Sequence, residues 1–371
     1  MRAPDGGVVA SPTDVNHSPD RALPLDVSIL ICTHNSEAVI ADALRHLRNQ
    51  LVGPSLAWEV LVVDFQSTDG TKRACSCAWD GCDVAFRFLS ESRPGKARAL
   101  ETGLTAAKGE AVCIVDDDNW VFPSYVETAH DVMSTHPDVG AIGAHGVPYL
   151  EDPAPYWFER YAGVYAVGHQ ADSRGYLSGR RNWFWGAGTV VRNSAWRAVA
   201  STGFEFVLNP SREGAARTFR PGYAGGEDQE LSFALQHAGY RLWYEPSLEY
   251  YHFLSRERLT TEYLFRTTRG TAVSAPVLRL YLSAFPSRAV GDVIRTATYR
   301  SAVLMVLHEL WALAAGLLRA THEPSASIEV RRLIVGFWSC LHGVFRLVGQ
   351  SRAILAQIHR LRQGNPKASE R

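Results

Sequence analysis

The sequence predicts an α/β fold, in which a mainly parallel sheet is covered by helices on both faces, followed by a C-terminal α-helical appendage. Two observations predict the sheet. Apolar runs of strand length alternate with segments of helical periodicity from residue 27 to residue 147. The runs are continuously apolar, as is typical of parallel strands buried on both faces. The appendage follows from two longer apolar segments in the last third of the chain.

The individual elements follow from these runs. We predict strands over residues 27–32, 59–64, 84–89, 111–115, 139–147, 183–191 and 240–244. Helices are predicted over residues 39–47, 94–109, 123–135 and 226–239. Pro94 and Gly109 bracket the second of them, with proline at the start and glycine at the end. An apolar content of 46% with 20% charged residues is ordinary for a globular protein.

Three regions are predicted. Residues 1–24 are rich in Pro, Asp and Ser and predict a disordered tail without an apolar signal segment. Residues 25–255 form the α/β domain, and residues 256–371 form a helical region. Its apolar segments, 302–318 and 333–348, are interrupted by polar residues and fall at or below the roughly 17–25 residues that span a bilayer. We therefore expect surface-lying helices or a helical bundle.

Charge and cysteine content restrict the partners and the compartment. The net charge is +0, yet the chain from Arg319 onward holds nine Arg and Lys against three Asp and Glu. This excess favours an anionic lipid surface over nucleic acid, and a solvated helical tail is the alternative. Cys75, Cys77 and Cys82 lack the paired spacing of a zinc site. Reduced thiols predict a cytoplasmic protein, with the inner face of the plasma membrane as a site of association.

Polar residues follow three of the predicted strands. Thr33–Asn35 follow the first strand, Asp64 ends the second, and Asp116–Asp118 follow the strand over 111–115. Ligands of such sheets bind beyond the carboxyl ends of the strands. The sequence therefore predicts one binding site at this edge.

The run Asp116-Asp117-Asp118 predicts a cation site. Three adjacent carboxylates repel one another unless a cation or donors neutralise them, and Mg²⁺ takes oxygen ligands. Alone, such a run is typical of a solvated turn, but the other polar clusters favour the site. Strand alternation would direct Asp116 and Asp118 one way and Asp117 the other.

Three further positions are candidates, each with a structural alternative. Lys96 lies in the first turn of a helix, where the dipole opposes its charge, so an anion such as a diphosphate is expected nearby unless it faces solvent. Glu227-Asp228 could place a general base beside an acceptor, although acids also stabilise a helix start. His252 is a packed aromatic-cluster residue unless it lies beside the aspartates.

Five segments together resemble family 2 inverting glycosyltransferases of the GT-A, Rossmann-like fold. They are VSILICTHN, VLVVDFQSTDGT, PGKARALETGLTAAKGEAVCIVDDDN, WGAGTVVRNSAW and GGEDQELSFALQHAGYRLWYEP, with His252 after them. The resemblance implies a nucleotide-sugar donor, Mg²⁺ or Mn²⁺ as cofactor, and inversion at the anomeric carbon. The domain 25–255 would be the catalytic domain.

The resemblance also assigns the site residues. Asp228, beside Glu227, would be the base that deprotonates the acceptor. The metal ligands would be Asp118, Asp116 and His252. The donor-binding residues would be Thr33, Asn35, Glu37, Asp64, Lys96, Asp116 and Asp117.

The expected activity is transfer of a single sugar to an acceptor hydroxyl of a glycan, a lipid-linked glycan or a small molecule. A Gln-x-x-Arg-Trp signature of processive enzymes is absent after Asp228. Phe65, Glu101 and Asn119 depart from the family pattern, which leaves the base contact and nearby polar contacts open. The alternatives are sugar transfer to polyprenyl phosphate and a non-catalytic sugar-nucleotide-binding protein. We expect peripheral membrane association through the C-terminal helices and no nucleic-acid partner.

Overall fold

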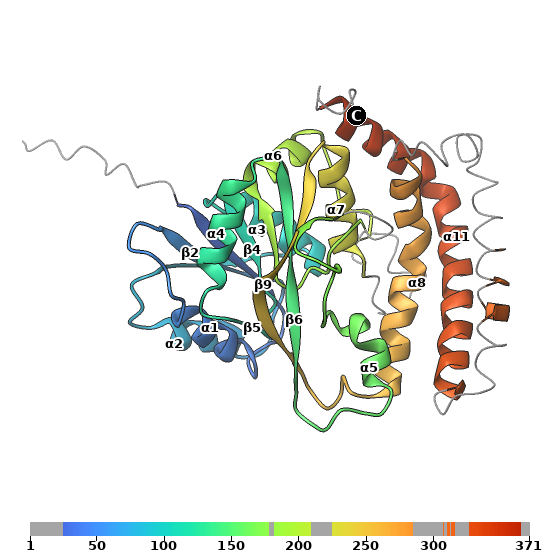
Figure 1. Cartoon of the computed structure of the whole chain (residues 1–371), viewed down its shortest axis with the longest axis horizontal. Helices are drawn as coiled ribbons and strands as arrows, with labels where there is room; N and C mark the ends of the chain where they lie inside the picture. The colour runs from blue at the N-terminus through green and yellow to red at the C-terminus, as the bar shows by residue number, and fades with distance from the viewer. Residues whose placement is uncertain are drawn as a thin grey trace, which may run out of the picture.

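A mixed sheet of nine strands forms the centre of the molecule (Figure 1). The computed structural model describes residues 25–177, 182–208, 225–284, 307, 310, 311, 313–315 and 326–364. Within these residues the strand order is β3-β2-β1-β4-β8-β6-β9-β5, with β7 paired to β9. The strands are β1 (Val27–Thr33), β2 (Trp58–Asp64), β3 (Ala85–Ser90), β4 (Ala111–Ile114), β5 (Asn119–Val121), β6 (Val139–Leu150), β7 (Gly175–Tyr176), β8 (Thr189–Arg192) and β9 (Arg241–Leu254).

The sheet has a parallel part and a mixed part. The strands β1 to β4 pair in parallel, as the continuous apolar runs predict. The strand β8 is antiparallel to both of its neighbours, whereas β6 and β9 run in parallel. The strand β5 returns antiparallel to β9, which pairs Asn119 with His252. This last pairing brings two distant parts of the chain to one place.

Helices cover both faces of the sheet, so the predicted α/β fold class with a C-terminal helical region is confirmed. One face carries α1, α2 and α4, and the other carries α3, α6 and α7. A short α5 and the 3-10 helix η1 follow β6. The helices are α1 (Ile40–Arg48), α2 (Thr71–Trp79), α3 (Lys96–Ala106), α4 (Tyr125–Thr135), α5 (Phe158–Tyr161), η1 (Ala162–Tyr165), α6 (Asn193–Ser201), α7 (Glu227–His237), α8 (Thr261–Ser283) and α11 (Ala326–Gln363).

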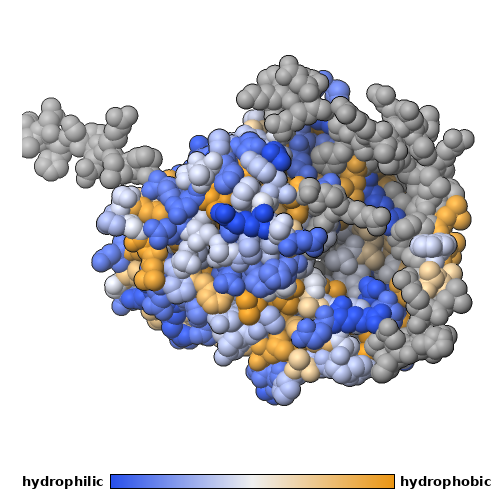
Figure 2. All heavy atoms as spheres, in the orientation of Figure 1, coloured by the Kyte–Doolittle hydropathy of each residue, from blue (hydrophilic) through white to orange (hydrophobic). Residues whose placement is uncertain are grey.

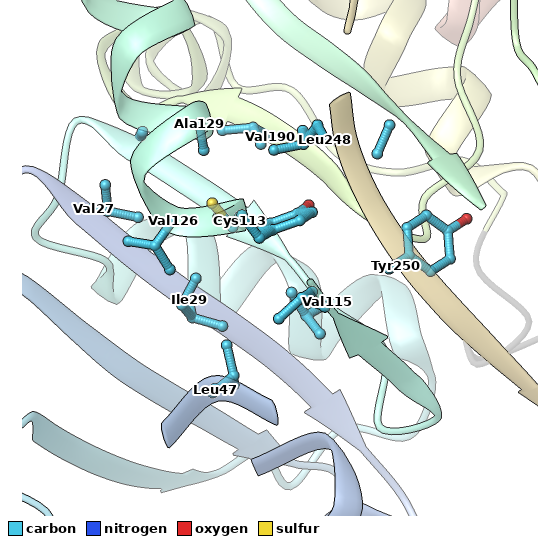
Figure 3. Close-up of a cluster of buried hydrophobic side chains, with 14 of the residues drawn as sticks. Val27, Ile29, Leu47, Cys113, Val115, Val126, Ala129, Val190, Leu248 and Tyr250 are labelled. Atoms are coloured by element: carbon cyan, nitrogen blue, oxygen red, sulfur yellow. The ribbon is translucent and has the colours of Figure 1, made fainter. Parts of the chain in front are cut away.

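The alternation of side chains along β1 explains this two-sided packing. Successive strand residues point to opposite faces, and Ile29 joins one core whereas Leu30 joins the other. Figure 3 shows the first core, in which Val126 and Ala129 of α4 lie over the strand residues Ile29 and Cys113. Both cores are apolar at these positions, so residues 29–32 of β1 are all apolar, whereas the buried Ser28 hydroxyl donates a hydrogen bond to Glu59 at 2.8 Å.

The C-terminal helices pack against the α/β domain. In Figure 1, α8 lies between the sheet and α11. Gln357 of α11 donates hydrogen bonds to the Glu205 carbonyl (3.0 Å) and to the Tyr281 hydroxyl (2.9 Å) of α8. Arg360 donates to the Thr202 carbonyl at 3.0 Å. A helical bundle seated on the α/β domain, one of the two expected arrangements, is therefore present.

The structure differs from the predicted elements at two places near the carboxyl ends of the strands. The segment 183–191 is a strand only from Thr189 onward, because its glycines allow the preceding residues to turn into the site. The three-residue strand β5 is too short to give a periodic signal, and the sequence did not predict it. Most of the predicted helix 302–318 lies outside the described residues. No helix in the described part of the chain is long and apolar enough to cross a bilayer.

Candidate functional site

The three aspartates lie in a turn between β4 and β5, where each contacts a different partner. Asp116 accepts a hydrogen bond from Lys96 Nζ at 2.5 Å. Asp117 accepts from the Thr33 hydroxyl at 2.9 Å and from the Ser36 hydroxyl. Asp118 points toward β9. The side chain of Asp117 points away from those of Asp116 and Asp118, as predicted. The reason differs from the predicted strand alternation: β4 ends at Ile114, so the turn sets these directions.

Asp118 is buried between an imidazole and a guanidinium. Its Oδ1 lies 3.4 Å from His252 Nε2, and its Oδ2 lies 2.5 Å from an Arg258 nitrogen. Burial alone would raise the pKa of Asp118, but His252 and Arg258 hold that pKa well below its usual range. This carboxylate is therefore ionised at neutral pH.

Asp117 behaves differently. Its burial, together with the negative charge of Asp118, raises its pKa to about 6. Two hydroxyls of the β1–α1 segment hold it in place. Asp117 therefore takes up a proton near pH 6, at a pH where Asp118 stays ionised.

Glu227 and Asp228 open α7 on the opposite side of the site. The carboxylate of Asp228 accepts backbone N–H bonds from Gly186 (3.0 Å) and from Gln229 (2.8 Å). Burial raises the pKa of Asp228. Burial and the charge of Asp228 raise the pKa of Glu227 to about 7. The two N–H donors orient Asp228, and its raised pKa makes it a better proton acceptor.

A cavity of about 970 Å³ connects these groups. The predicted residues that line it are Lys96, Asp116, Asp117, Asp118, Glu227, Asp228 and His252. They come from α3, the β4–β5 turn, α7 and β9. The structure thus brings together acids that are more than a hundred residues apart in the sequence.

The remaining predicted residues, Thr33, Asn35, Glu37 and Asp64, do not line this cavity. Thr33 is fully buried. Asn35 adopts a positive φ of 53° and accepts a hydrogen bond from the Thr68 backbone N–H at 2.8 Å. Glu37 accepts from the Gly70 N–H at 2.9 Å. These contacts join the ends of β1 and β2 and stabilise the loops beside the cavity.

The end of the cavity near β1 and β2 is lined by the neighbours of the predicted residues. His34 and Phe65 stack with their ring centroids 5.2 Å apart and both face the cavity. Asp64 is the last residue of β2, directly before Phe65, and its buried Oδ1 has no hydrogen-bond partner among the described residues. A buried carboxylate oxygen in this state can accept a hydrogen bond from a ligand.

Sequence reasoning missed several residues of the site, most clearly Arg258, Tyr165 and Tyr263. Arg258 follows His252 by six positions, in a segment with two arginines that carries no signal to separate them. The rings of Tyr165 and Tyr263 stack with their centroids 5.7 Å apart. The backbone carbonyl of Tyr165 accepts a hydrogen bond from His252 Nδ1 at 2.7 Å. These contacts depend on tertiary packing.

Asp118 and His252 are the side chains that could hold a divalent cation, and Arg258 contacts both of them. His252 donates from Nδ1 to a backbone carbonyl, so Nε2 faces Asp118 Oδ1 at 3.4 Å and an Arg258 nitrogen at 3.2 Å. Among the described residues no three His, Cys, Asp or Glu side chains come together as a metal-binding set. Mg²⁺ is commonly held by one or two carboxylates, with substrate phosphates and water completing its shell. All six cysteines are thiols and not disulfides.

Comparison with known proteins gives a family for most of the α/β domain. Residues 28–199 match Glycosyl transferase family 2. Glycosyltransferase GlyG of Streptococcus pneumoniae is 26% identical over 133 residues, which are 36% of this chain and 42% of that protein. The poly(ribitol-phosphate) beta-N-acetylglucosaminyltransferase TarS of Staphylococcus aureus is 30% identical over 121 residues, which are 32% of this chain and 21% of that protein. The beta-monoglucosyldiacylglycerol synthase of Trichormus variabilis is 34% identical over 116 residues, which are 30% of this chain and 24% of that protein.

Solved structures similar to the chain include S. aureus TarS 1–349 in complex with UDP-GlcNAc, with 16% identity and a TM-score of 0.49 over 89% of this chain and 92% of that one. The mannosyltransferase PcManGT from Pyrobaculum calidifontis, in complex with GDP-Man and Mn²⁺, has 20% identity and a TM-score of 0.46. The match covers 94% of this chain and 82% of that one. The chain spans less than half the length of the three curated relatives named above. Residues 28–199, which carry the sheet from β1 to β8 and the three aspartates of the β4–β5 turn, belong to glycosyl transferase family 2, as the sequence motifs predict.

Proposed function

We propose that this protein is a non-processive, inverting glycosyltransferase that moves one sugar from a nucleoside-diphosphate sugar to an acceptor hydroxyl. The observation that carries this proposal is the single cavity lined by Asp116–Asp118 on one side and by Glu227 and Asp228 on the other. The family match over residues 28–199 supports it. One side of this cavity suits a donor diphosphate, and the other holds a carboxylate that can accept a proton.

The donor nucleotide lies at the carboxyl ends of β1 and β2 in this proposal. The base stacks on the aromatic pair His34 and Phe65, and Asp64 accepts a hydrogen bond from the base or ribose. Lys96 and Arg258 bring two positive charges to the diphosphate, since both line the cavity and both already contact aspartates of the β4–β5 turn. Thr33, Asn35 and Glu37 position the loops that hold the nucleotide.

Asp228 acts as the general base. The acceptor oxygen attacks the anomeric carbon from the side opposite the leaving diphosphate, and its proton passes to the Asp228 carboxylate. The bond between the anomeric carbon and the diphosphate oxygen breaks with its electron pair on that oxygen, so the configuration inverts. Gly186 and Gln229 hold the carboxylate in position through their N–H groups.

Asp118 and His252, with Asp116 beside them, are the residues that would hold Mg²⁺ or Mn²⁺. When bound, such an ion supplies Lewis-acid stabilisation of the charge that develops on the diphosphate. Arg258 already neutralises Asp118 in the protein itself. The lysine and the arginine therefore supply part of the same stabilisation from the chain.

Substitution of the base tests the proposal. We expect Asp228→Asn to lower transfer by roughly 100-fold or more, because the amide keeps the shape of the site but cannot take the proton. Donor turnover is followed by release of nucleoside diphosphate. Asp131→Asn, on the exposed side of α4, is the matched control and should leave turnover unchanged.

Ligand binding is tested separately by thermal shift with UDP, GDP and their sugar conjugates, with and without Mn²⁺. We expect a rise in the melting temperature with at least one nucleotide, larger when Mn²⁺ is present. Full turnover by Asp228→Asn would remove the catalytic assignment. The absence of stabilisation by every nucleotide would contradict the proposed donor.

A further inference from the structure

The cavity has two unlike walls. The wall that holds the predicted residues is charged. The second wall is made by two C-terminal helices, and its residues on α8 are Tyr263, Thr267, Thr268, Thr271, Ala272, Ala275 and Leu278. On α11 they are Arg332, Leu333, Gly336, Phe337 and Cys340. Arg332 is the one charged side chain among these described residues, and Glu329 binds it through two contacts at 3.2 and 3.3 Å.

The spacing of these residues makes the second wall long. On α8 they recur at intervals of one, three or four residues between Tyr263 and Leu278, which is one face of a helix. At 1.5 Å per residue this face is about 22 Å long. The α11 residues from Arg332 to Cys340 form a similar face of about 12 Å. Half of these twelve residues are glycine, alanine or threonine, so short side chains line much of this part of the cavity, which we call the slot.

This wall begins beside the proposed base. Ser274 of α8 donates a hydrogen bond to the Gly225 carbonyl at 2.5 Å, two residues before Glu227. A Cβ built on Gly226 would lie 3.5 Å from Leu278 Cδ1. The turn that presents Asp228 is therefore in direct contact with α8. A molecule lying along α8 would bring one end to the Asp228 carboxylate.

Two hydroxyl groups of the cavity, Thr268 in this wall and Tyr165 on η1, have unused hydrogen-bonding capacity. Tyr165 and Thr268 both line the cavity and both are more than nine-tenths buried. Neither the Tyr165 hydroxyl nor the Thr268 hydroxyl has a hydrogen-bond partner among the described residues. Buried polar atoms are normally paired, so a polar group of a ligand is a natural partner for them. The remainder of the wall offers mainly apolar surface.

We propose that the α8–α11 wall is the acceptor subsite, and that the acceptor has a hydrocarbon-chain body with its reactive hydroxyl held at Asp228. The proposal rests on the proposed function and names its acceptor class. Beyond Tyr165 and Thr268, a free oligosaccharide would find partners for few of its hydroxyls along this wall, whereas a hydrocarbon chain with a polar group for those two hydroxyls loses few hydrogen bonds there. The length of the α8 face, about 22 Å, favours an extended chain over a compact ring system.

Binding of alkyl glucosides to the full chain tests the proposal. Isothermal titration calorimetry would compare methyl, hexyl, heptyl and octyl β-D-glucoside below the concentration at which they form micelles. We expect octyl glucoside to bind, methyl glucoside not to bind, and affinity to increase by about fourfold for each added methylene, since each buried methylene contributes a constant gain. Equal binding of methyl and octyl glucoside would overturn the proposal, as would tighter binding of naphthyl glucoside than of octyl glucoside.

Variants of α11 locate the binding. Gly336 lines the cavity, and a Cβ there meets only Thr268 Cγ2, at 4.0 Å. We expect Gly336→Leu to fold, to fill the slot and to weaken octyl glucoside binding at least tenfold. Ala353→Leu adds the same bulk at an exposed position of α11 and should leave the affinity unchanged. Trp338, which is 63% exposed, tests adventitious surface binding: if Trp338→Ala abolishes binding and Gly336→Leu does not, the slot is not the subsite.

Nucleotide binding separates this proposal from the proposed function. Both proposals are supported if UDP or GDP stabilises the wild type and Gly336→Leu alike, while the variant binds octyl glucoside more weakly than the wild type does. If a nucleotide binds but chain length has no effect, the acceptor class is wrong and the transferase assignment stands. If alkyl chains bind as expected but no nucleotide does, the proposed function fails while the apolar subsite remains.

Discussion

At the scale of single residues, the site depends on how the protein compensates its clustered acids. Lys96 pairs with Asp116, two hydroxyls hold Asp117, and Arg258 pairs with Asp118. The buried carboxylates therefore do not repel one another freely. Among the described residues Glu227 and Asp228 have no such ion-pair partner, and burial raises the pKa of both. Asp118 is thus held in the ionised form, whereas the pKa values of Asp117, Glu227 and Asp228 are all raised.

The pH dependence of turnover should report Glu227. Its pKa is raised to about 7 by burial and by Asp228, so Glu227 holds a proton below pH 7 and loses it above. Ionised Glu227 places a negative charge next to Asp228, which raises the pKa of Asp228 and strengthens it as a base. We expect kcat/KM to rise through pH 7 in the wild type. In Glu227→Gln this rise should be absent, measured from pH 5.5 to 8.5. The same inflection in the variant would assign it to another group.

At the scale of elements, α7, α8 and α11 are joined by buried polar contacts. Glu230 of α7 is fully buried and accepts hydrogen bonds from the Tyr281 hydroxyl of α8 (2.8 Å) and from the Val207 and Leu208 N–H groups. His237, at the end of α7, donates to the Tyr281 carbonyl at 3.0 Å. The helix that carries the proposed base is thus fixed to the C-terminal helices at both ends.

His237 should make stability depend on pH. Burial and the neighbouring Arg362 lower its pKa to about 4, against about 6.5 in an unfolded chain. Between these values the unfolded state binds more protons, so the free energy of unfolding falls as the pH decreases from 6.5 toward 4. We expect a contribution of roughly 1–2 kcal/mol between pH 7 and 5 that disappears in His237→Gln. Urea unfolding of both proteins at the two pH values measures it, and an equal loss in both would exclude His237 as its source.

Two glycines of α11 should respond in opposite directions to alanine. A Cβ on Gly343 would lie 2.4 Å from the Val273 carbonyl oxygen of α8, so Gly343→Ala must push the helices apart. We expect a loss of about 1–3 kcal/mol. A Cβ on Gly336 has its nearest neighbour at 4.0 Å, and alanine there should gain about 0.5–1 kcal/mol from helix propensity. Melting temperatures of the two variants check the pair. Equal shifts would mean that α11 does not approach α8 at Gly343.

At the scale of the whole molecule, the C-terminal region completes the cavity and is more than an appendage. The helices α8 and α11 supply one wall, and Arg258, in the segment that leads into α8, holds Asp118. On the face drawn in Figure 2, hydrophilic and hydrophobic side chains are interspersed over the α/β domain. Membrane contact through the outer side of α11 stays a prediction. The same helix has an inner side that belongs to the site.

Removal of one contact should loosen this arrangement. Gln357 makes hydrogen bonds with both backbone groups of Glu205 and with Tyr281, and it is buried. Gln357→Leu would leave these groups without their partner, and we expect a loss of roughly 2–4 kcal/mol in equilibrium urea unfolding. Gln363→Leu is the matched control: it is exposed on the same helix, and its hydrogen bond to His359 is local. If both variants unfold alike, α11 is not held through Gln357.

Much of the fold was predictable because its signals are local. The continuous apolar runs of β1, β2 and β4 and the glycine and proline at the ends of α3 lie within short windows of sequence. Asp116–Asp118 and Glu227-Asp228 could be singled out for the same reason, as polar clusters at the ends of predicted elements. The three-residue strand β5 and the true start of β8 could not be predicted in this way, because tertiary contacts define them.

The sequence by itself determined the α/β class, the family of residues 28–199 and the acids that face the cavity. Only the tertiary structure decided which partner each acid has. The pairing of β5 with β9 brings His252 to Asp118, and the segment after β9 brings Arg258 to it. It also placed α8 and α11 over the site. The physical reason is that periodicity records which face of an element is buried, whereas strand register and helix docking depend on contacts between residues far apart in the chain.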